Sequence, residues 1–508
     1  KEEVKFMEGI DVWERSSWEE CRRLTGKDPV STRWVDIDKG RGEEVDVRCR
    51  LVARDFKTKG GAGDFDVFAA MPPLEAKRML FRMARVEGAV GGQSSQGKVK
   101  LMFVDVKKAH LNGKLKEGEH AFVELPEEAG GGVGKLRRWL YGMRPAASAW
   151  EDEYVEYLTE QGFRRGRSAP TVMYHEGKDV RLVVWGDDFT FLGRDKDLKW
   201  CAEVMEMKYE IKVRAMLGPE AGDDKEVRIL NRVVRWEKDR IVYEGDEKHA
   251  QVVIREMGLE AESKGLDVPV LVGTERTEGE DLDAAGIAKY RRIAATVNYL
   301  AMDRPDLQFA ASVLGRSMSR PTKDSMAALK RTARYLLKHP SMRYIYESVD
   351  LEQAKVIEGF SDSDWAGCRT TRRSMSGGVM SIAGGTMKSW SNRQGSVALS
   401  SGEAEYYASV KTASELLGLR ALGEDLGWRF DIWMWVDSSA AKSIASRLGN
   451  GKLRHLDVRF LWLQEATRDR SLRVKKIEGK KNPADIMTKS KSFGEACEQL
   501  GRVGIFGP

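Results

Sequence analysis

The stretch RLVVWGDDFTFLG, residues 181–193, decides how the first half of the chain folds. Two short apolar runs, 182–185 and 189–192, have the composition of strands, and the Gly-Asp-Asp between them predicts a tight hairpin turn. The turn carries two adjacent carboxylates, Asp187 and Asp188, which repel each other unless a cation lies between them. Because divalent cations prefer carboxylate oxygens, the hairpin indicates a metal site, although an Asp-rich surface turn explains the same tripeptide.

The stretch VKLMFVDVKKAHLNG, residues 99–113, places a third carboxylate at the end of an apolar strand. Side chains alternate along a strand, so Asp105 shares a face with apolar residues and needs water, a metal or a basic partner. Lys107 and Lys108 are the basic residues nearest in sequence. Three carboxylates that converge from two strands could instead hold two metal ions, which clamp the attacking and leaving oxygens in phosphoryl transfer.

A second set of acids follows in the C-terminal third. The pattern there predicts three strands, a helix, a strand, a helix, a strand and a helix, over residues 356–362, 377–383, 387–391, 401–419, 431–437, 438–449, 472–477 and 482–489. Asp362 and Asp437 end two of these strands, Glu405 lies on the first helix, and Asp485 lies in the first turns of the last helix. Four acids in this order favour a functional site over four solvated surface positions.

Composition limits the class of protein. The 508 residues suffice for two to four domains with buried cores. No run approaches the ~18 apolar residues of a membrane span and no signal-peptide pattern opens the chain, so we expect no membrane partner. The five cysteines are scattered and never in C-x-x-C spacing, which indicates a reducing compartment and no zinc site. Lys and Arg exceed Asp and Glu by 85 − 79 = 6, a mild positive charge that permits nucleic acid as a partner.

A basic stretch with a helical pattern lies between the two sets of acids. Its cationic residues are Lys323, Lys330, Arg331, Arg334, Lys338 and Arg343. Two interpretations are open: a solvated helix face, which is the commoner outcome, or a stripe that follows a phosphate backbone.

Several segments, in this order and at this spacing, resemble the copia-type retrotransposon reverse transcriptase with its C-terminal ribonuclease H domain. The matching segments are VRCRLVARDFKTKG (47–60), VDVKKAHLNG (104–113), LRRWLYGMRPAASAW (136–150), WGDD (185–188), GFSDSDWAG (359–367), SSGEAEYYA (400–408), VDSSAA (436–441) and NPADIMTK (482–489). The resemblance covers nearly the whole chain, and the set of segments is far more specific than any one of them.

The resemblance implies a mixed α/β (α+β) fold, built as a right-hand polymerase followed by a ribonuclease H-like domain. We expect the fingers and palm over residues 1–215 and a helical thumb and connection over 216–350. The ribonuclease H-like domain should then occupy 351–492, with a C-terminal tail over 493–508.

The resemblance also implies the metal ligands. Each active site should hold two Mg²⁺ ions, with Mn²⁺ as the substitute, and the seven catalytic acids are Asp105, Asp187 and Asp188 in the polymerase and Asp362, Glu405, Asp437 and Asp485 in the ribonuclease H.

Two of these assignments have a competitor close in sequence. Asp364 competes with Asp362, and we prefer Asp362 because it directly ends the apolar run. Glu403 competes with Glu405, and the A-E-x-x-A pattern around Glu405 favours that residue.

The nucleotide site is implied by the same family pattern. Arg48 and Arg50 in the fingers should face the triphosphate, which a guanidinium binds with a planar fork of donors. His110 takes the place of an aromatic residue that in the family stacks under the sugar and excludes ribonucleotides. Two further departures are Trp185-Gly186, where the family has Tyr-Val, and Pro145, where it has Gln.

The function implied is that of a retrotransposon RNA-directed DNA polymerase that also hydrolyses the RNA strand of RNA–DNA hybrids. Its partners would be an RNA template, a DNA primer, the RNA–DNA hybrid and dNTPs, in an intracellular setting that is either a cytoplasmic retroelement particle or the nucleus. Protease, integrase and capsid regions would lie upstream in a longer polyprotein, and the oligomeric state is left open.

Two alternatives belong to other classes. Gly-Asp-Asp hairpins also look like those of viral RNA replicases, which would make the chain an RNA-templated RNA polymerase. Because of Pro145 and His110, the chain could instead be a catalytically decayed remnant that only binds nucleic acid.

Overall fold

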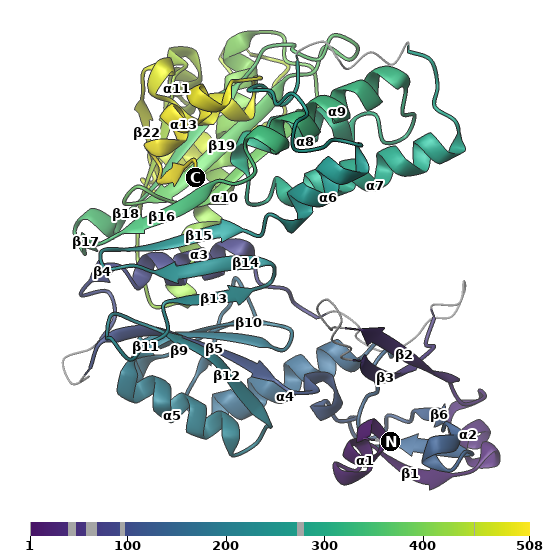
Figure 1. Cartoon of the computed structure of the whole chain (residues 1–508). Coiled ribbons are helices and arrows are strands. Elements are labelled where there is room, and N and C mark those ends of the chain that lie inside the picture. The colour runs from purple at the N-terminus through teal and green to yellow at the C-terminus, as the bar shows by residue number, and fades with distance from the viewer. Residues whose placement is uncertain (1, 39–46, 57–68, 92–96, 272–278, 452) are drawn as a thin grey trace. The chain divides into compact units, whose positions relative to one another are not determined.

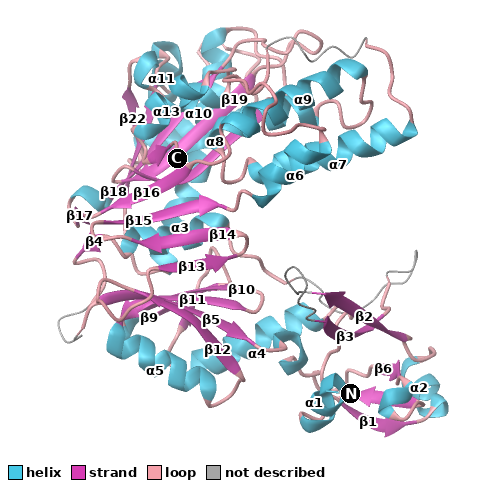
Figure 2. Ribbon diagram, in the orientation of Figure 1, coloured by secondary structure: helices cyan, strands magenta, loops and turns pink. Residues whose placement is uncertain are grey.

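The computed structural model describes residues 2–38, 47–56, 69–91, 97–271, 279–451 and 453–508. The chain divides into two compact units, one made of Lys1–Pro73 with Met102–Arg214 and the other of Leu74–Leu101 with Ala215–Pro508. Both contain helices and strands (Figures 1 and 2), so the mixed α/β fold expected from the sequence is confirmed. Residues 74–101, which the sequence analysis placed with the fingers and palm, pack with the second unit. No helix within the described ranges is long and apolar enough to cross a membrane.

The first unit is built mainly from strands. The elements that lie wholly or mainly in it are α1 (Glu2–Gly9), β1 (Trp13–Ser16), α2 (Trp18–Thr25), β2 (Thr32–Asp38), β3 (Val47–Ala53), β5 (Val99–Val106), β6 (Phe122–Glu124), β7 (Val133–Leu136), α4 (Ala146–Glu160), β8 (Arg164–Arg165), β9 (Val172–His175), β10 (Val180–Trp185), β11 (Asp188–Arg194), α5 (Asp195–Glu206) and β12 (Ile211–Leu217).

The central sheet contains the hairpin expected from the sequence. Its strand order is β12-β5-β11-β10-β9-β8, so β5 lies beside that hairpin. Strands β10 and β11 pair with Trp185 opposite Asp188, which leaves Gly186 and Asp187 as a two-residue turn. Gly186 has φ 66°, the positive value that a type II′ turn requires at its first central residue. A Cβ there would meet nothing within 4 Å, so the backbone conformation, rather than space, favours glycine.

A second glycine fixes the segment LYG to the β2–β3 ribbon. Gly142 has φ 84°, and a Cβ on it would lie 2.3 Å from the carbonyl oxygen of Ala53. The Ala53 amide donates to the carbonyl of Tyr141 at 2.7 Å. Leu51 on β3 and Leu140 are both fully buried in the core of this part of the unit. The segment therefore requires a glycine for both its conformation and its close approach to β3.

The second unit consists of two stretches of the chain, Leu74–Leu101 and Ala215–Pro508. Its elements before residue 351, with the last strand of the chain, are α3 (Leu74–Met83), β4 (Val86–Glu87), β13 (Glu226–Ile229), β14 (Arg232–Trp236), β15 (Arg240–Gly245), α6 (Lys248–Glu256), α7 (Ala284–Leu300), α8 (Pro305–Gly315), α9 (Lys323–Lys338), β16 (Arg343–Glu347), β17 (Val349–Asp350) and β23 (Ile505–Phe506). Strands β13, β14, β15, β16 and β23 form one sheet in that order.

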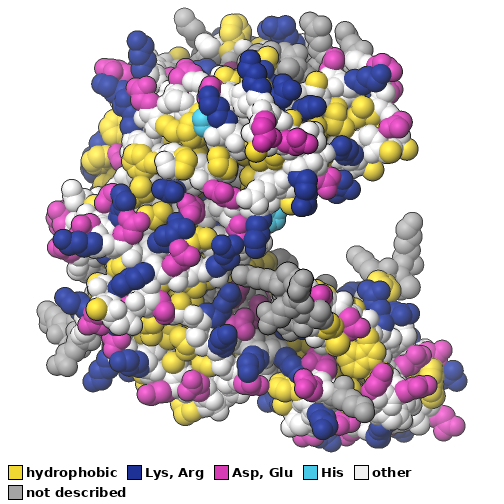
Figure 3. All heavy atoms as spheres, in the orientation of Figure 1, with side chains coloured by type: hydrophobic (Ala, Val, Ile, Leu, Met, Phe, Trp, Pro, Cys, Tyr) yellow, Lys and Arg dark blue, Asp and Glu magenta, His cyan; other side chains and the backbone are white. Residues whose placement is uncertain are grey.

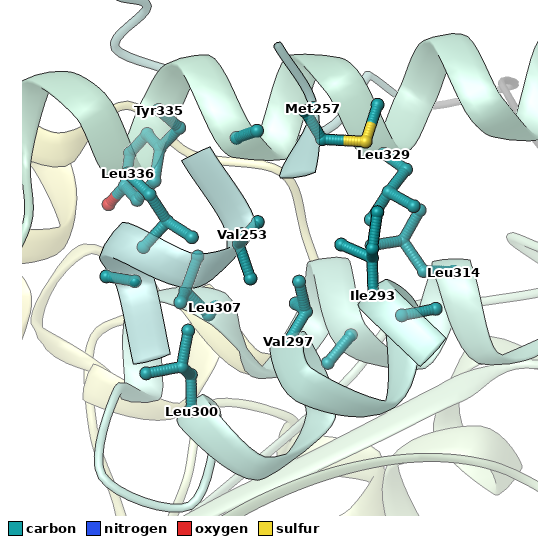
Figure 4. Packing of buried hydrophobic residues seen from close by; sticks show 14 of the residues in the cluster. Val253, Met257, Ile293, Val297, Leu300, Leu307, Leu314, Leu329, Tyr335 and Leu336 are labelled. Atoms are coloured by element: carbon teal, nitrogen blue, oxygen red, sulfur yellow. The ribbon is translucent and has the colours of Figure 1, made fainter. Parts of the chain in front are cut away.

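Four helices of this unit bury a common apolar core. Helices α6, α7, α8 and α9 contribute Val253, Val297, Leu307 and Leu329, all of which are fully buried (Figure 4). The buried residues of α7, among them Val297, recur at helical spacing and so form one apolar stripe.

The C-terminal part of the second unit contains a five-stranded sheet. Its elements are β18 (Val356–Ser363), β19 (Met375–Ile382), β20 (Gly385–Arg393), α10 (Ser401–Asp425), β21 (Asp431–Val436), α11 (Ser439–Ser446), α12 (Trp462–Arg468), β22 (Arg473–Lys476), a 3₁₀ helix (Pro483–Met487) and α13 (Phe493–Gly501). The strand order is β20-β19-β18-β21-β22, with β18, β21 and β22 parallel to one another and β19 antiparallel to both of its neighbours. All the strands expected here are present, but the helix expected from residue 482 is a single 3₁₀ segment, and α13 begins six residues after it ends.

Helix α3 is held in the second unit by a buried ionic cluster. The Asp303 carboxylate accepts hydrogen bonds from Arg78 on α3 at 2.8 Å, from Arg232 on β14 at 2.8 Å and from the Tyr243 hydroxyl at 2.7 Å. Arg78 also donates to the carbonyl of Met387 at 3.1 Å. Because both guanidinium groups are buried, Asp303 provides the negative charge that compensates them.

We predict that Asp303→Ala lowers the free energy of unfolding of the second unit by about 3–5 kcal/mol, since it leaves two buried cations without their shared anion. Chemical denaturation followed by tryptophan fluorescence measures this loss. Glu352→Ala, which removes an exposed ion pair with Lys355, is the control and should leave stability close to wild type. Equal stability of the two variants would contradict the prediction.

Candidate active sites

The hairpin and the adjacent strand bring the three polymerase acids to one edge of the sheet. Asp187 is the second turn residue, and Asp188 is the first residue of β11. The Val106 amide at the end of β5 donates to the carbonyl of Asp187 at 3.0 Å, which places Asp105 next to the turn. All three acids are half-buried.

A tryptophan on α4 holds the hairpin turn through a hydrogen bond. The indole Nε1 of Trp150, on α4, donates to the carbonyl of Gly186 at 2.8 Å, and the ring packs edge-on against Phe189. A Cβ on Gly113 would lie 2.9 Å from the Cβ of Ala149. The segments 110–113 and 146–150 are therefore in close contact, and only a glycine fits at position 113. The sequence analysis missed the role of Trp150, although this residue closes one of the segments it singled out.

The two lysines that follow Asp105 in the sequence pair with acids outside the three-acid set. Lys107 forms its ion pair with Glu210, and Lys108 pairs with Glu3 at 2.7 Å, so neither lysine is committed to Asp105. The basic partner of the acid set is instead Arg214 on β12, whose Nη1 lies 3.1 Å from Asp188 Oδ1.

Of the expected nucleotide-binding residues, His110 lies near Asp187, and His110 and Arg50 share Tyr141 as a neighbour. His110 is 6.0 Å from Tyr141 between ring centroids, and the Arg50 guanidinium lies 5.5 Å from the same tyrosine ring. Burial lowers the pKa of His110 more than the nearby Asp187 raises it, so the imidazole is neutral at pH 7. Arg48, two residues before Arg50 on β3, is exposed.

Pro145 has a backbone role at this site. It lies at the N-terminal boundary of α4, and its carbonyl accepts from the Ala149 amide at 2.9 Å and from the Ser148 hydroxyl at 3.0 Å. It therefore starts the helix that carries Trp150.

Three of the four C-terminal acids meet in a tight cluster. Strands β18 and β21 are parallel neighbours, so Asp362 near the end of one and Asp437 just after the other lie side by side. Glu405, in the second turn of α10, completes a set in which one carboxylate oxygen from each residue lies within 4.8 Å of the others. Within the described ranges this is the one acidic set that meets this condition.

The cluster is short of positive charge. Burial raises the pKa of Asp362, with Lys489 opposing the rise, and burial also raises the pKa of Asp437. The pKa of Glu405 rises because of burial first and because of the charges on Asp362 and Asp437 second. Each of these carboxylates is therefore less easily ionised than an isolated one, as expected where like charges share a buried site.

The fourth acid lies beside the cluster and is paired with lysines. Asp485, on the 3₁₀ helix, forms ion pairs with Lys489 and, at 3.0 Å, with Lys491. Although burial acts in the opposite direction, these two ammonium groups hold the pKa of Asp485 below its usual value. Lys489 also lies 3.8 Å from Asp362, so it links the fourth acid to the cluster. The sequence analysis missed this lysine, although it ends the segment NPADIMTK.

The two competing acids serve the fold. Asp364 Oδ1 accepts from the Met375 amide at 2.5 Å. Glu403 accepts from the Tyr407 hydroxyl at 2.7 Å and lies 2.9 Å from His455 Nε2. Both carboxylates are therefore occupied by protein groups outside the cluster.

The basic stretch of α9 is largely paired with acids or carbonyls. Lys323 pairs with Glu280, Lys338 pairs with Asp267, and Arg331 donates to the carbonyl of Val268. Lys, Arg, Asp and Glu side chains are intermixed on the face in Figure 3. These pairings favour the solvated helix face over a phosphate-binding stripe.

We predict that the acid cluster costs stability in the absence of divalent cations. With raised folded-state pKa values, the cost is present when the carboxylates ionise and disappears as pH falls through those values. In chelator at about pH 8, Asp437→Asn should therefore melt above wild type, and the difference should shrink at about pH 5. Thermal unfolding at both pH values measures this, and an identical pH dependence for the two proteins would refute it.

The chain is similar to known proteins over most of its length. Residues 16–225 match the family described as "Reverse transcriptase (RNA-dependent DNA polymerase)". The chain is 26% identical over 497 residues to the "Retrovirus-related Pol polyprotein from transposon TNT 1-94" of Nicotiana tabacum, a match that covers 94% of this chain and 36% of that protein. It is 23% identical over 491 residues to the corresponding polyprotein from transposon RE1 of Arabidopsis thaliana, with 94% and 32% covered. The chain thus spans about a third of the length of these relatives.

A solved structure agrees with the fold. The foamy viral protease-reverse transcriptase in complex with RNA/DNA hybrid matches with a TM-score of 0.50 at 10% identity, over 94% of this chain and 52% of that one. At this identity the likeness concerns the fold alone. The family match places a reverse transcriptase domain at residues 16–225, and nearly the whole chain is similar to Pol polyproteins of copia-type retrotransposons.

Proposed function

We propose that the chain copies RNA into DNA at the hairpin site and hydrolyses the RNA strand of the resulting hybrid at the C-terminal cluster. The observation that carries the proposal is the presence of two separate acid sets, each at the ends of adjacent strands, in one chain of the reverse transcriptase family. The foamy viral relative was solved with an RNA/DNA hybrid, which supports the same kind of partner here.

The donor chemistry of the C-terminal cluster fits Mg²⁺, with Mn²⁺ as the substitute. All its ligand atoms are carboxylate oxygens, which hard divalent cations prefer. Glu405 Oε2 is buried and has no hydrogen-bond partner among the described residues, as expected of an acceptor meant for a cation. Asp362, Glu405 and Asp437 would hold the ions, with Asp485 reached by displacing its lysines. Such ions, when bound, activate the attacking oxygen and stabilise the leaving one.

At the hairpin site, Asp105, Asp187 and Asp188 would hold the ions, with Arg214 giving up its ion pair to Asp188. Arg50 would bind the phosphates of an incoming dNTP, because a guanidinium offers a planar fork of donors. Arg48 is an exposed second donor on the same strand face. The neutral His110 ring would lie against the sugar, next to Tyr141, and disfavour a 2′-hydroxyl there.

We predict that the two activities can be removed one at a time. Asp187→Asn should lower Mg²⁺-dependent primer extension on an RNA template by at least about 100-fold and leave hybrid cleavage unchanged, and Asp437→Asn should do the reverse. Extension and cleavage are measured on the same preparations with labelled primer and labelled RNA. Asp431→Asn, an exposed acid at the start of β21, is the control for Asp437 and should retain both activities.

The same two assays distinguish the proposed function from a catalytically decayed remnant and from an RNA-templated RNA polymerase. A decayed remnant would bind hybrid but neither extend nor cleave it, and an RNA-templated RNA polymerase would extend with rNTPs in preference to dNTPs.

We predict that Trp150→Phe lowers the rate of primer extension about 10-fold, because it keeps the buried ring but removes the hydrogen bond that holds the turn. The apparent Mg²⁺ requirement should rise, and the KM for dNTP should change little. Hybrid cleavage by the same protein is the internal control and should be unaffected. Extension that is unchanged at limiting Mg²⁺ would show that the hydrogen bond does not position the acids.

A further inference from the structure

Two loops next to the C-terminal cluster expose apolar side chains. The loop of residues 364–374 follows β18 and exposes 57% of Trp365, three residues after Asp362. The loop of residues 394–400 precedes α10 and exposes 45% of Val397 and 67% of Leu399. Large apolar side chains at these exposures indicate a contact surface when they lie together.

The loops are joined and anchored by hydrogen bonds. The indole Nε1 of Trp365 donates to the carbonyl of Ala398 at 3.2 Å, which ties one loop to the other. The Ala366 amide donates to the Ser374 hydroxyl at 3.0 Å and closes the first loop on itself. The exposed indole is thus held in place with its polar edge satisfied and its ring available to a partner.

These loops also carry an excess of positive charge. Residues 364–374 and 394–400 contain three arginines (369, 372 and 373) and one acid, Asp364, a difference of 3 − 1 = 2. The Asp364 carboxylate is half-buried and accepts a hydrogen bond from the Met375 amide at the start of β19. Arg369 and Arg372 are exposed, and neither has an ion-pair partner in the described part of the chain.

We propose that Trp365, Arg369 and Arg372 form a contact surface that seats the RNA–DNA hybrid against the C-terminal cluster. The indole packs on the sugars of the hybrid's shallow minor groove, and the two guanidinium groups bind phosphates on either side of it. This surface rests on the proposed ribonuclease H function, and it adds which residues select and position the substrate.

A nucleic acid fits this surface better than a protein partner does. An aromatic ring among arginines matches the sugar–phosphate backbone, where the ring covers apolar sugar faces and the cations replace released counterions. The A-like shape of a hybrid offers a wide, shallow minor groove that side chains on a rigid loop can reach. The surface is also continuous with the acids, since the Ser363 amide, between Asp362 and Asp364, donates to Glu405 at 3.3 Å.

The first test separates binding from chemistry in hybrid cleavage by the full chain. Trp365→Ala should raise the KM for a labelled RNA–DNA hybrid about 10-fold and change kcat less than about twofold, and Trp365→Phe should restore most of the KM. Trp18→Ala, which removes another exposed tryptophan, is the matched control and should leave the KM unchanged. Primer extension by Trp365→Ala should match wild type.

The second test uses binding alone, in a chain made unable to cleave by Asp437→Asn. Fluorescence anisotropy with a labelled hybrid gives the slope of log Kd against log salt. Replacing Arg369 and Arg372 together by Gln should reduce that slope by about 2, since each lost phosphate contact removes about 0.9.

The outcomes distinguish this proposal from the function on which it rests. If the wild-type chain does not cleave hybrid, the ribonuclease proposal fails, and the salt slope still decides whether the loops bind nucleic acid. An unchanged KM in Trp365→Ala together with an unchanged slope overturns the contact surface. A changed sedimentation coefficient of Trp365→Ala with an unchanged KM also overturns it, because the apolar loops then contact another copy of the chain.

Discussion

Repulsion among carboxylates that the fold holds close together is the constraint on which both candidate sites depend. At the C-terminal cluster it is severe, because three acids share a buried space and their pKa values all rise. At the hairpin the acids are only half-buried, and an arginine pairs with one of them. Acids arranged in this way do not stabilise the fold. Their presence at two sets of strand ends therefore favours a functional role over a structural one.

Close backbone contacts set the positions of those acids. Gly142 lets its segment approach β3, and Gly113 lets the segment that follows the strand of Asp105 contact α4. In the C-terminal sheet a Cβ on Gly377 would lie 2.2 Å from the Cβ of Met487, so this glycine allows the 3₁₀ helix with Asp485 to pack on β19. Each of these contacts joins segments that the sequence analysis had treated separately.

Strands and turns depend on local sequence pattern and were predictable from the sequence. Ion pairs between residues far apart in the chain were not. Alternation and strand ends were enough to find the hairpin and the run that ends at Asp362. The ion pairs were not predictable, because Arg214 is 26 residues from Asp188 and nothing local sets it apart from other arginines of the chain. The 3₁₀ segment at Pro483–Met487 was taken for a longer helix, since a proline at the first position indicates a helix start but does not set the length of the helix. Residues 74–101 joined the second unit through Arg78 and Asp303, a contact between residues 225 apart.

The cations that do lie near the acids indicate how the two sites remain folded before any substrate arrives. Lys489 contacts both Asp485 and Asp362, and Arg214 contacts Asp188, so at each site a basic side chain offsets part of the negative charge. Both side chains are long and partly exposed, with 47% of the Lys489 and 36% of the Arg214 side chain accessible. They can therefore move away from the acids at a small cost in free energy. A side chain fixed in the cluster would compete permanently with divalent cations for the same oxygens. Under the proposed function, a mobile side chain would lower the repulsion in the free protein and would leave the carboxylates available to a divalent cation.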